Sequence, residues 1–379
     1  MSNTSSSPTF CPAPWTSLNI DQTGRVSPCM HSYESTGNIK TTTIQEIIHG
    51  PKLASIRDHM RQGLWHSTCQ LCRQAEATTG VSARTTRHCD SSTLAAIDAT
   101  PDTYFTLEHI VVNWSNLCNL TCVYCNSDAS TAWQQIRGIP INHVKNEHPD
   151  LIQLARDHGS SVQGLTLGGG EPLLQKGLVD FLQCLNPQQV RVLVTTNISI
   201  DLERNPVYCE LRTWPNVAWQ VSFDNTDPAK FEYVRNGAVW STFFNNVQQM
   251  KQQGQHVVAH PAYSIYNALE LVDYYKFCTD HNLDIFWCDL THPWDLDIRR
   301  FPVDVRNRAV AEIDRVVNLY GHTTNMAVTT LEAYRKTLLD NSYLISPEYR
   351  PNLSRFHAEK ERELNKATQF TELWPEYAN

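Results

Sequence analysis

Three cysteines, Cys118, Cys122 and Cys125, stand at C-x3-C-x2-C spacing directly after the apolar run Ile110–Trp114. A short loop on which three thiolates converge is a suitable ligand set for an iron–sulfur cluster. Three ligands on a cluster of four irons leave one iron without a protein ligand, and a small chelating cofactor can bind there. The alternatives are a zinc site or three unrelated buried cysteines. Zinc usually takes four protein ligands, and the next cysteine along the chain is Cys184.

Four more cysteines lie on an earlier segment that carries hairpin and helix signals: Cys11, Cys29, Cys69 and Cys72. Alternating apolar residues around the turn Asp21–Gly24 predict a hairpin. Helical spacing of apolar residues predicts helices over Thr43–His49 and Lys52–Leu64. Four thiolates can fully ligate one iron–sulfur cluster or one zinc ion. Cys89 lies nearby and is a candidate substitute ligand.

Glycines and polar residues end three of the predicted strands, at Gly168–Pro172, Thr195–Asn197 and Ser222–Asp224. Glycine lets a ligand approach the backbone closely. The hydroxyl and amide groups of Thr196 and Asn197 could bond a ribose, or they could only cap the following turn. The carboxyl ends of parallel strands share one edge of a sheet, so we expect these residues to lie together.

Arg235 follows this last group, and its planar fork suits a carboxylate ligand. The alternative is a surface ion pair with Glu232, one helical turn away. In the final predicted strand Cys288 and Asp289 are neighbours, and because strands alternate between faces only one of them points inward. An inward cysteine could donate a hydrogen atom, and an inward aspartate could orient substrate or act as a base. We favour Asp289, because Cys288 can equally be a core residue.

The cysteine loop, with Tyr124 just before its last cysteine, resembles the signature of the radical S-adenosylmethionine enzymes. Gly168–Pro172 matches the GGEP motif of that family, and Ser222–Asp224 with Phe231–Gly237 is similar to its Ser-x-Asp and Tyr-x-Arg-x-Gly stretch. The order C-x12-G-x4-C followed by C-x2-C resembles the auxiliary-cluster module called the twitch domain, here ahead of the barrel.

This resemblance implies S-adenosylmethionine and two [4Fe–4S] clusters as cofactors. It assigns the site-differentiated cluster to Cys118, Cys122 and Cys125, and the auxiliary cluster to the four earlier cysteines. In the family, one-electron reduction of the first cluster cleaves the sulfonium and gives a 5′-deoxyadenosyl radical. The residues implied to bind S-adenosylmethionine are Tyr124, Gly169, Gly170, Glu171, Thr196, Asn197, Ser222, Asp224 and Arg235.

The elements that must position these residues alternate between strands and helices. Strands are predicted over Glu108–Trp114, Gly164–Leu167, Gln189–Val194, Ala218–Phe223, His256–Ile265 and Ile285–Leu290. Six βα units are too few for the usual eight-stranded barrel, so we expect an α/β fold with an open, partial (β/α)6 barrel. A small hairpin-plus-helix module precedes it and a helical extension follows it. The predicted divisions are 1–9 (disordered tail), 10–90 (twitch-like module), 91–104 (linker), 105–295 (barrel) and 296–379 (helical extension).

Composition restricts the functional classes. The net charge of −8, from 31 basic and 39 acidic residues, argues against nucleic-acid binding driven by phosphate neutralisation. The polar start Met1–Pro8 has no signal-peptide core, and no apolar run approaches the roughly 18 residues of a membrane span. We therefore expect a cytoplasmic protein without a membrane partner, in which clustered cysteines indicate metal or redox sites.

The sequence thus predicts an enzyme of oxidoreductase or isomerase type that abstracts hydrogen from an unactivated C–H bond. Its expected reductant is an external one-electron donor of flavodoxin or ferredoxin type. The expected substrate is a ribosomally made peptide, and the alternative is a small molecule such as an amino sugar or a nucleotide. With four cysteine ligands the auxiliary cluster has no open iron, which suits an electron acceptor or relay. The alternative from another class is a non-catalytic iron–sulfur or zinc scaffold.

Overall fold

The computed structural model describes residues 4–87, 89–141, 149–321, 326–340 and 351–377. Its contacts divide the chain into two compact units. The first contains Met1–Asn116, His143–Val194 and Pro206–Val217, and the second contains Leu117–Asn142, Thr195–Asn205 and Ala218–Asn379.

The first unit is built on a sheet with the strand order β6-β5-β4-β1-β2-β3. Strands β1, β4, β5 and β6 run parallel, and β2 and β3 continue the sheet antiparallel. The strands span β1 (Ser17–Ile20), β2 (Arg25–Ser27), β3 (Gly37–Asn38), β4 (His109–Asn113), β5 (Gly164–Gly168) and β6 (Arg191–Thr196). The last two residues of β6 belong to the second unit.

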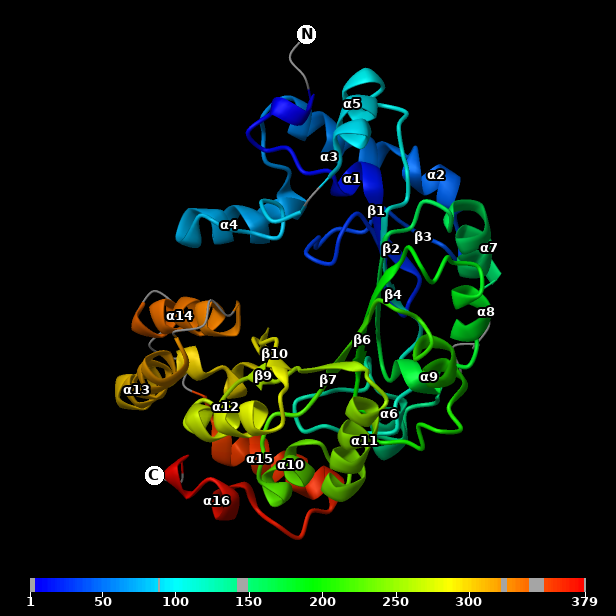
Figure 1. Ribbon diagram of the computed structural model, residues 1–379. Helices are drawn as coiled ribbons and strands as arrows, with labels where there is room; N and C mark the ends of the chain where they lie inside the picture. Colours follow the sequence, from blue (N-terminus) through cyan, green and yellow to red (C-terminus); the bar gives the residue numbers. More distant parts are fainter. Residues whose placement is uncertain (1–3, 88, 142–148, 322–325, 341–350, 378–379) are drawn as a thin grey trace. The chain divides into compact units, whose positions relative to one another are not determined.

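The helices of the first unit are α1 (Ala13–Thr16), α2 (Ile44–Ile48), α3 (Pro51–Arg61), α4 (Gln70–Thr79), α5 (Ser91–Ala99), α7 (Pro149–His158), α8 (Leu178–Leu182) and α9 (Pro206–Leu211). Helices α7, α8 and α9 follow one another along one side of the parallel strands (Figure 1). Helix α2 begins with a full capping box, in which Thr43 and Glu46 bond each other's backbone N–H groups.

The second unit contains the parallel strands β7 (Val217–Val221), β8 (His256–Ala259) and β10 (Asp284–Ile285), with β9 (Ala262–Tyr263) paired to β11 (Cys288–Asp289). Its helices are α6 (Thr131–Ile136), α10 (Pro228–Val234), α11 (Trp240–Gln252), α12 (Leu271–Asp280), α13 (Val303–Tyr320), α14 (Met326–Leu339), α15 (Leu353–Leu364) and α16 (Phe370–Leu373). Helices α12, α13 and α14 pack in succession (Figure 1).

The predicted α/β class with a parallel sheet and a helical C-terminal region is confirmed. The last two predicted strands, however, are each broken in two. Pro261 lies at the first break, between β8 and β9, and it interrupts the strand because proline has no N–H for the ladder. Phe286 and Trp287 separate β10 from β11 at the matching position, where Phe286 N donates to Ala259 O at 2.8 Å and Cys288 N donates to Pro261 O at 2.9 Å.

The hairpin of the first unit is not separate from the parallel sheet. Strand β1 pairs in parallel with β4, with Ser17 opposite His109 and Ile20 opposite Val112. Trp15, fully buried before β1, anchors this connection because its indole N–H donates to Pro101 O at 2.7 Å. The hairpin therefore continues the sheet beyond β4 and covers what would otherwise be an unpaired strand edge.

The predicted tail (1–9) and the predicted linker (91–104) both contain regular structure among the described residues. Ser5, in the predicted disordered tail, donates from its backbone N to an Asp98 carboxylate oxygen at 2.8 Å. Helix α5 lies inside the predicted linker, and it is capped by Asp90, whose carboxylate accepts from Thr93 N at 2.8 Å. Side-chain capping gives this polar stretch a helix start that its composition alone does not show.

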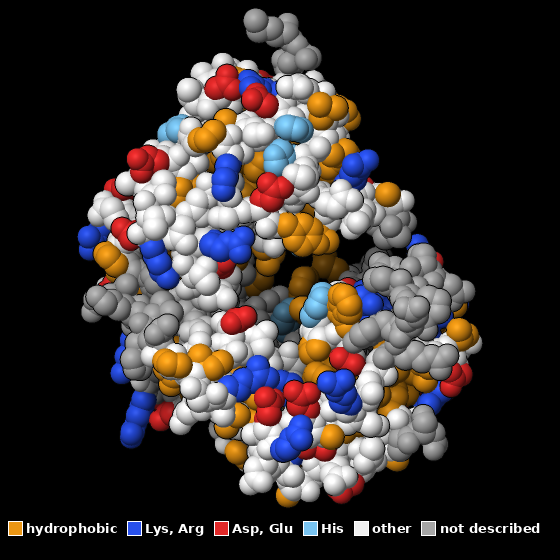
Figure 2. All heavy atoms as spheres, turned by 180° about the vertical axis from the view of Figure 1, so that it is seen from behind, with side chains coloured by type: hydrophobic (Ala, Val, Ile, Leu, Met, Phe, Trp, Pro, Cys, Tyr) orange, Lys and Arg blue, Asp and Glu red, His pale blue; other side chains and the backbone are white. Residues whose placement is uncertain are grey.

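On the face drawn in Figure 2, Lys and Arg side chains are interspersed with Asp and Glu. Among the described residues, no helix has the length and apolar character that a membrane crossing requires.

Candidate functional site

The cysteine loop of the second unit is pinned by backbone hydrogen bonds to the end of α10. Thr121 N donates to Asn236 O at 3.0 Å, and Val123 N donates to Val234 O at 2.9 Å. Gly237 has φ of +96°, and a side chain there would crowd Leu120. The loop conformation is therefore set by contacts more than a hundred residues away in the sequence.

The three thiols of this loop lie together. Cys122 is buried, and Cys118 and Cys125 are half-buried. Burial raises the pKa of the Cys122 thiol to about 12, and the neighbouring Cys125 and Cys118 contribute to the rise. Bringing these thiolates close without a cation is unfavourable, so a positively charged group among them would stabilise the loop.

A buried ion pair stands beside the loop. Asp224 accepts from Arg235 Nε at 2.8 Å and from the Tyr124 hydroxyl at 3.1 Å through the same carboxylate oxygen. Its other oxygen accepts from Ala262 N at 2.9 Å. Arg235 Nη1 lies 4.0 Å from Cys122 Sγ. Burial opposes the charge of Arg235, but the Asp224 carboxylate keeps the pKa of the guanidinium above its usual value.

These contacts decide between the two interpretations of Arg235. The arginine is 8% exposed, so it is not a surface residue. Glu232, the alternative partner, instead accepts from Trp240 N at 2.9 Å. The surface ion pair is wrong, and Arg235 belongs to the surroundings of the cysteine loop.

The end of β6 approaches the loop from another side. Asn197 Nδ2 lies 3.0 Å from Asn119 Oδ1 and 4.0 Å from Cys118 Sγ. Its Oδ1 accepts from Ser199 N at 2.8 Å, so the same side chain also caps its own turn. The Thr196 hydroxyl accepts from Ile198 N at 3.1 Å, and Thr196 O accepts from Ser222 N at 2.9 Å.

Cys288 and Asp289 have different surroundings. Cys288 is opposite Ala262, whose N–H bonds Asp224, whereas Asp289 is opposite Tyr263. The Asp289 carboxylate lies 2.8 Å from Arg299 Nη1 in an ion pair. In-register neighbours on adjacent strands share a face, so Cys288 is on the Ala262 face and Asp289 on the other. Burial raises the pKa of the Cys288 thiol, and Asp289 and Asp224 add to the rise, whereas the charges that act on Asp289 are Arg299 and Asp297.

The turn after β5 lies in the first unit. Gly169 has φ of +108°, and an added Cβ would stand 2.7 Å from Ser115 O. Gly170 N donates to that same carbonyl at 2.9 Å. Glu171 is 1% exposed, and its carboxylate accepts from Leu173 N at 3.0 Å. The turn is thus a rigid, glycine-dependent structure that holds a buried carboxylate.

The four earlier cysteines gather in the first unit. Cys11, Cys29 and Cys69 pack around a common apolar cluster. Burial raises the pKa of Cys11 to about 11 and that of Cys69 to about 12, with mutual contributions from the other thiolates of the set. Arg87 opposes the rise at Cys11, and Arg84 opposes it at Cys69. Cys89 also lies close enough for Cys11 to raise its pKa.

Within the part of the chain that the structure describes, no group of three or more His, Cys, Asp or Glu side chains is arranged to hold a metal ion. The donor chemistry nevertheless fits iron–sulfur clusters, because one set offers three thiols and the other offers four. A cluster is larger than one ion, so the sulfurs that ligate it stand farther apart than those of a zinc site.

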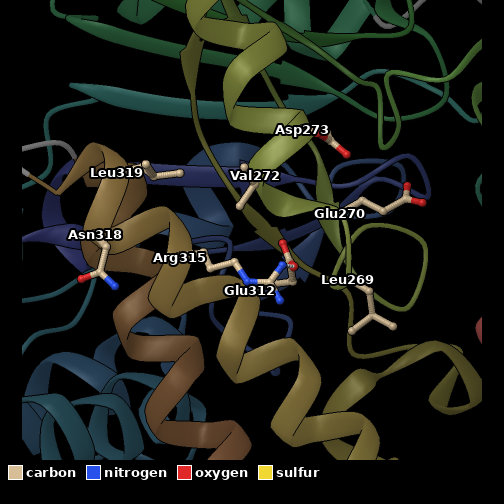
Figure 3. Close-up of a pocket in the computed structure, with 8 residues that line it drawn as sticks. All are labelled: Leu269, Glu270, Val272, Asp273, Glu312, Arg315, Asn318 and Leu319. Atoms are coloured by element: carbon tan, nitrogen blue, oxygen red, sulfur yellow. Dashed lines mark hydrogen bonds and ion pairs between the residues drawn. The ribbon is translucent and has the colours of Figure 1, made fainter.

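The second unit has a pocket of about 560 Å³. Glu312 and Arg315 of α13 line it and point toward each other (Figure 3). None of the predicted site residues lines it. Its lining residues are Leu269, Glu270, Val272, Asp273, Glu312, Arg315, Asn318 and Leu319. We assign no role in the site to this pocket.

Two residues beside the loop have no signal in the sequence pattern. Trp133 is fully buried, and its indole N–H donates to Cys122 O at 3.0 Å. The Lys360 ammonium lies 4.0 Å from the centroid of the Trp133 ring. Lys360 lies more than 230 residues beyond the loop, so only the tertiary structure shows the contact.

Comparison with known proteins gives two domain matches. Residues 11–73 match the SPASM iron–sulfur cluster-binding domain, and residues 112–278 match the radical SAM superfamily. Among curated proteins, the chain is 24% identical over 195 residues to a GTP 3′,8-cyclase of Peptoclostridium acidaminophilum, covering 48% of this chain and 55% of the relative. It is 34% identical over 87 residues to a 7-carboxy-7-deazaguanine synthase of Clostridium acetobutylicum, covering 23% and 36%. The chain thus spans about half the length of the first of these relatives, and less of the second.

Among solved structures, SuiB of Streptococcus suis matches with a TM-score of 0.42 and 13% identity, over 80% of this chain and 68% of that one. The enzyme anSMEcpe with bound AdoMet matches with a TM-score of 0.43 and 13% identity, over 56% and 62%. Through its two domain matches, the chain belongs to the radical SAM superfamily of enzymes, whose members use S-adenosylmethionine and a [4Fe–4S] cluster, and it carries a further iron–sulfur cluster-binding domain ahead of the radical SAM domain.

Proposed function

We propose that this chain cleaves S-adenosylmethionine reductively and uses the resulting radical to abstract hydrogen from an unactivated C–H bond. The observation that carries the proposal is the convergence of the three-cysteine loop, the Asp224–Arg235 pair and Asn197 in one unit. When bound, the cluster and S-adenosylmethionine supply the electron transfer and the 5′-deoxyadenosyl radical. The protein supplies the ligands, the orientation of the cofactor and the exclusion of water.

In this proposal Cys118, Cys122 and Cys125 ligate the site-differentiated cluster. Arg235 is held by Asp224 through Nε, so a terminal amino group of its fork remains directed toward the loop, where it suits the methionyl carboxylate. Asn197 approaches the loop from β6 and suits the ribose. Further residues that we assign to S-adenosylmethionine are Tyr124, Gly169, Gly170, Glu171, Thr196, Ser222 and Asp224.

Cys11, Cys29, Cys69 and Cys72 ligate the auxiliary cluster in this proposal. Their mutual electrostatic effects and the opposing charges of Arg84 and Arg87 support a site for an anionic metal cluster. A cluster with four protein ligands has no open iron, so we assign it the role of electron acceptor or relay. The first electron comes from an external donor of flavodoxin or ferredoxin type.

Two substrate classes are candidates. A ribosomally made peptide is the class that the sequence resemblance implies. A small molecule such as a nucleotide is the class suggested by the curated relatives, which are GTP 3′,8-cyclases and a 7-carboxy-7-deazaguanine synthase. In either case the last strand supplies the residue nearest the reacting carbon, and the two candidates are Asp289 as a base and Cys288 as a hydrogen donor.

The test is anaerobic incubation of the reconstituted chain with S-adenosylmethionine and a one-electron reductant, followed by quantification of 5′-deoxyadenosine. We expect its formation in the native chain and in Cys184→Ala, a control cysteine outside both sets. A chain that binds zinc but no iron, or that forms no 5′-deoxyadenosine with full iron content, contradicts the proposal. Adding GTP, or a short peptide encoded beside the gene, then separates the substrate classes, because the true substrate accelerates cofactor cleavage.

A further inference from the structure

The C-terminal segment 353–374 places a buried ammonium group against Trp133, a side chain that packs on the cysteine loop. Lys360 of α15 is 8% exposed, and its Nζ lies 4.0 Å from the centroid of the Trp133 ring. Trp133 in turn donates its indole N–H to Cys122 O at 3.0 Å. The charge of Lys360 therefore lies one side chain away from the loop.

A second lysine reaches the loop through two hydrogen bonds. Lys366 Nζ donates to Asn236 Oδ1 at 2.7 Å, and Asn236 Nδ2 donates to the Thr121 hydroxyl at 2.7 Å. The ammonium group also lies 4.6 Å from the centroid of the Tyr233 ring. Thr121 immediately precedes Cys122, so both lysines connect to the same short segment, each through a different intervening side chain.

Acidic neighbours do not fully balance the charges of the buried Lys360 and the half-buried Lys366. The nearest carboxylate to Lys360 is that of Glu363, at 3.8 Å, and it already accepts two bonds from Arg137 at 3.1 and 3.2 Å. Glu361 is engaged by the Tyr233 hydroxyl and by Phe370 N. Burying an ammonium group without a close counter-ion is unfavourable, so a further negative charge is needed nearby. Burial lowers the pKa of both lysines, to about 8 at Lys366. Glu363 opposes the lowering at Lys360 and Glu361 opposes it at Lys366, and the thiolates of Cys125 and Cys122 add a further, smaller negative charge at the same two lysines.

We propose that Lys360 and Lys366 hold positive charge behind the cysteine loop and raise the reduction potential of the cluster bound there. This inference rests on the proposed function. A [4Fe–4S] cluster with three thiolates carries a net charge of about −1 when oxidised and about −2 after one electron arrives from the external donor. An ammonium group in a low-dielectric setting stabilises the more negative state more strongly. The C-terminal extension thereby becomes part of the electron-accepting site.

The experiment is an anaerobic redox titration of the fully reconstituted chain, followed by electron paramagnetic resonance. The loop cluster is identified as the one whose signal changes when S-adenosylmethionine is added, and the auxiliary cluster serves as an internal reference. We compare Lys360→Met, Lys366→Met and their double variant with Lys360→Arg, which keeps the charge. The control is Lys336→Met, an exposed lysine on α14 of the same unit.

We expect the midpoint potential of the loop cluster to become more negative in both single variants, and most negative in the double variant. Lys360→Arg and Lys336→Met should stay near the native value, and the auxiliary cluster should not shift. An unchanged potential in the double variant with full iron content overturns the inference. Iron loss in Lys360→Met that Lys360→Arg does not restore shows a packing role and also overturns it. A native chain without a cluster that responds to S-adenosylmethionine contradicts the proposed function instead.

Discussion

At the scale of single residues, the candidate site depends on how Asp224 divides its hydrogen bonds. One carboxylate oxygen fixes Arg235 and Tyr124, and the other fixes the start of β9 through Ala262 N. The aspartate is 1% exposed, so its charge is offset mainly by the guanidinium. This arrangement holds the arginine fork in one orientation before any cofactor binds, which reduces the entropy that binding must overcome.

Arg235→Lys keeps the positive charge but removes the planar fork and the Nε bond to Asp224. We expect weaker binding of S-adenosylmethionine by about 1–3 kcal/mol, the usual contribution of a hydrogen bond to a charged group. Isothermal calorimetry on the reconstituted chain measures the change. The matched control is Arg204→Lys, which alters a highly exposed arginine. Equal affinity for S-adenosylmethionine in Arg235→Lys and the native chain would show that Arg235 does not bind the methionyl carboxylate.

Replacing Cys118, Cys122 and Cys125 together by Ala removes the three thiolates that converge on the loop. We expect this variant to form no 5′-deoxyadenosine, because the loop cluster that binds and reduces the cofactor can no longer form. Chromatography of the reaction mixture checks it, with circular dichroism to confirm folding. Formation of 5′-deoxyadenosine at the native rate would show that another iron site cleaves S-adenosylmethionine.

At the scale of elements, the sequence pattern was sufficient for strands whose apolar residues are continuous. Strands β4, β5, β6 and β7 lie where they were predicted, because each is a short apolar run bounded by turn residues. The break between β8 and β9 was missed although Pro261 signals it, since the apolar run continues on both sides. The matching break in the partner strand has no local signal, because Phe286 and Trp287 are good strand formers.

Some features of the candidate site could be predicted from local sequence motifs, and others depend on contacts between distant parts of the chain. The cysteine loop and the turn after β5 have local motifs, so their positions could be read from the sequence. The parallel pairing of β1 with β4, and the contact of Lys360 with Trp133, join segments that are far apart along the chain. Periodicity and spacing contain no information on such pairs, so only the tertiary structure shows them.

The cysteine set of the first unit is expected to be needed for turnover but not for cofactor cleavage. Replacing Cys11, Cys29, Cys69 and Cys72 by Ala should leave uncoupled 5′-deoxyadenosine formation measurable while product formation is lost. The reason is that these thiols belong to a different compact unit from the loop cysteines. Mass spectrometry of product and cofactor fragments measures both. Cys89→Ala is the control, and a loss of iron there would make Cys89 a ligand.

The C-terminal segment is held by a buried histidine that cannot easily accept a proton. His357 is 2% exposed, its Nδ1 bonds the Tyr233 hydroxyl at 3.0 Å, and its Nε2 has no hydrogen-bond partner among the described residues. Its ring stacks on Phe370 with centroids 3.8 Å apart. Phe370 and Trp374 are buried here, so the apolar end of the chain packs within its own unit.

Burial lowers the pKa of His357 to about 3, below its usual 6.5. The unfolded chain therefore binds a proton below about pH 6.5 while the folded chain does not, so stability is full above that pH and falls as pH decreases. The loss reaches the order of a few kcal/mol at low pH. Thermal unfolding between about pH 7.5 and 5.5 should show a shallower pH dependence in His357→Gln than in the native chain. Identical slopes would contradict this, and the exposed His49→Gln is the control.

At the scale of the whole molecule, the two cysteine sets belong to units with separate structural support. The four-cysteine set rests on the helices and hairpin of the first unit, and the three-cysteine loop rests on α10, α6 and the C-terminal segment. A molecule built in this way can lose one metal centre without unfolding the surroundings of the other. The iron content of variants that lack one cysteine set therefore tests whether the two centres assemble independently.

Anaerobically reconstituted chain should contain about eight irons, four for each cluster. The triple variant of the loop cysteines and the quadruple variant of the earlier set should each retain about half, and the combined variant should retain almost none. We expect the two losses to add, because the two sets belong to different compact units and mutations without shared partners are usually independent. Iron and sulfide analysis with protein quantification measures this, and Cys184→Ala is the control. If either variant lost all of its iron while remaining folded, the two centres would have to assemble as one structure, and their assignment to separate units would be wrong.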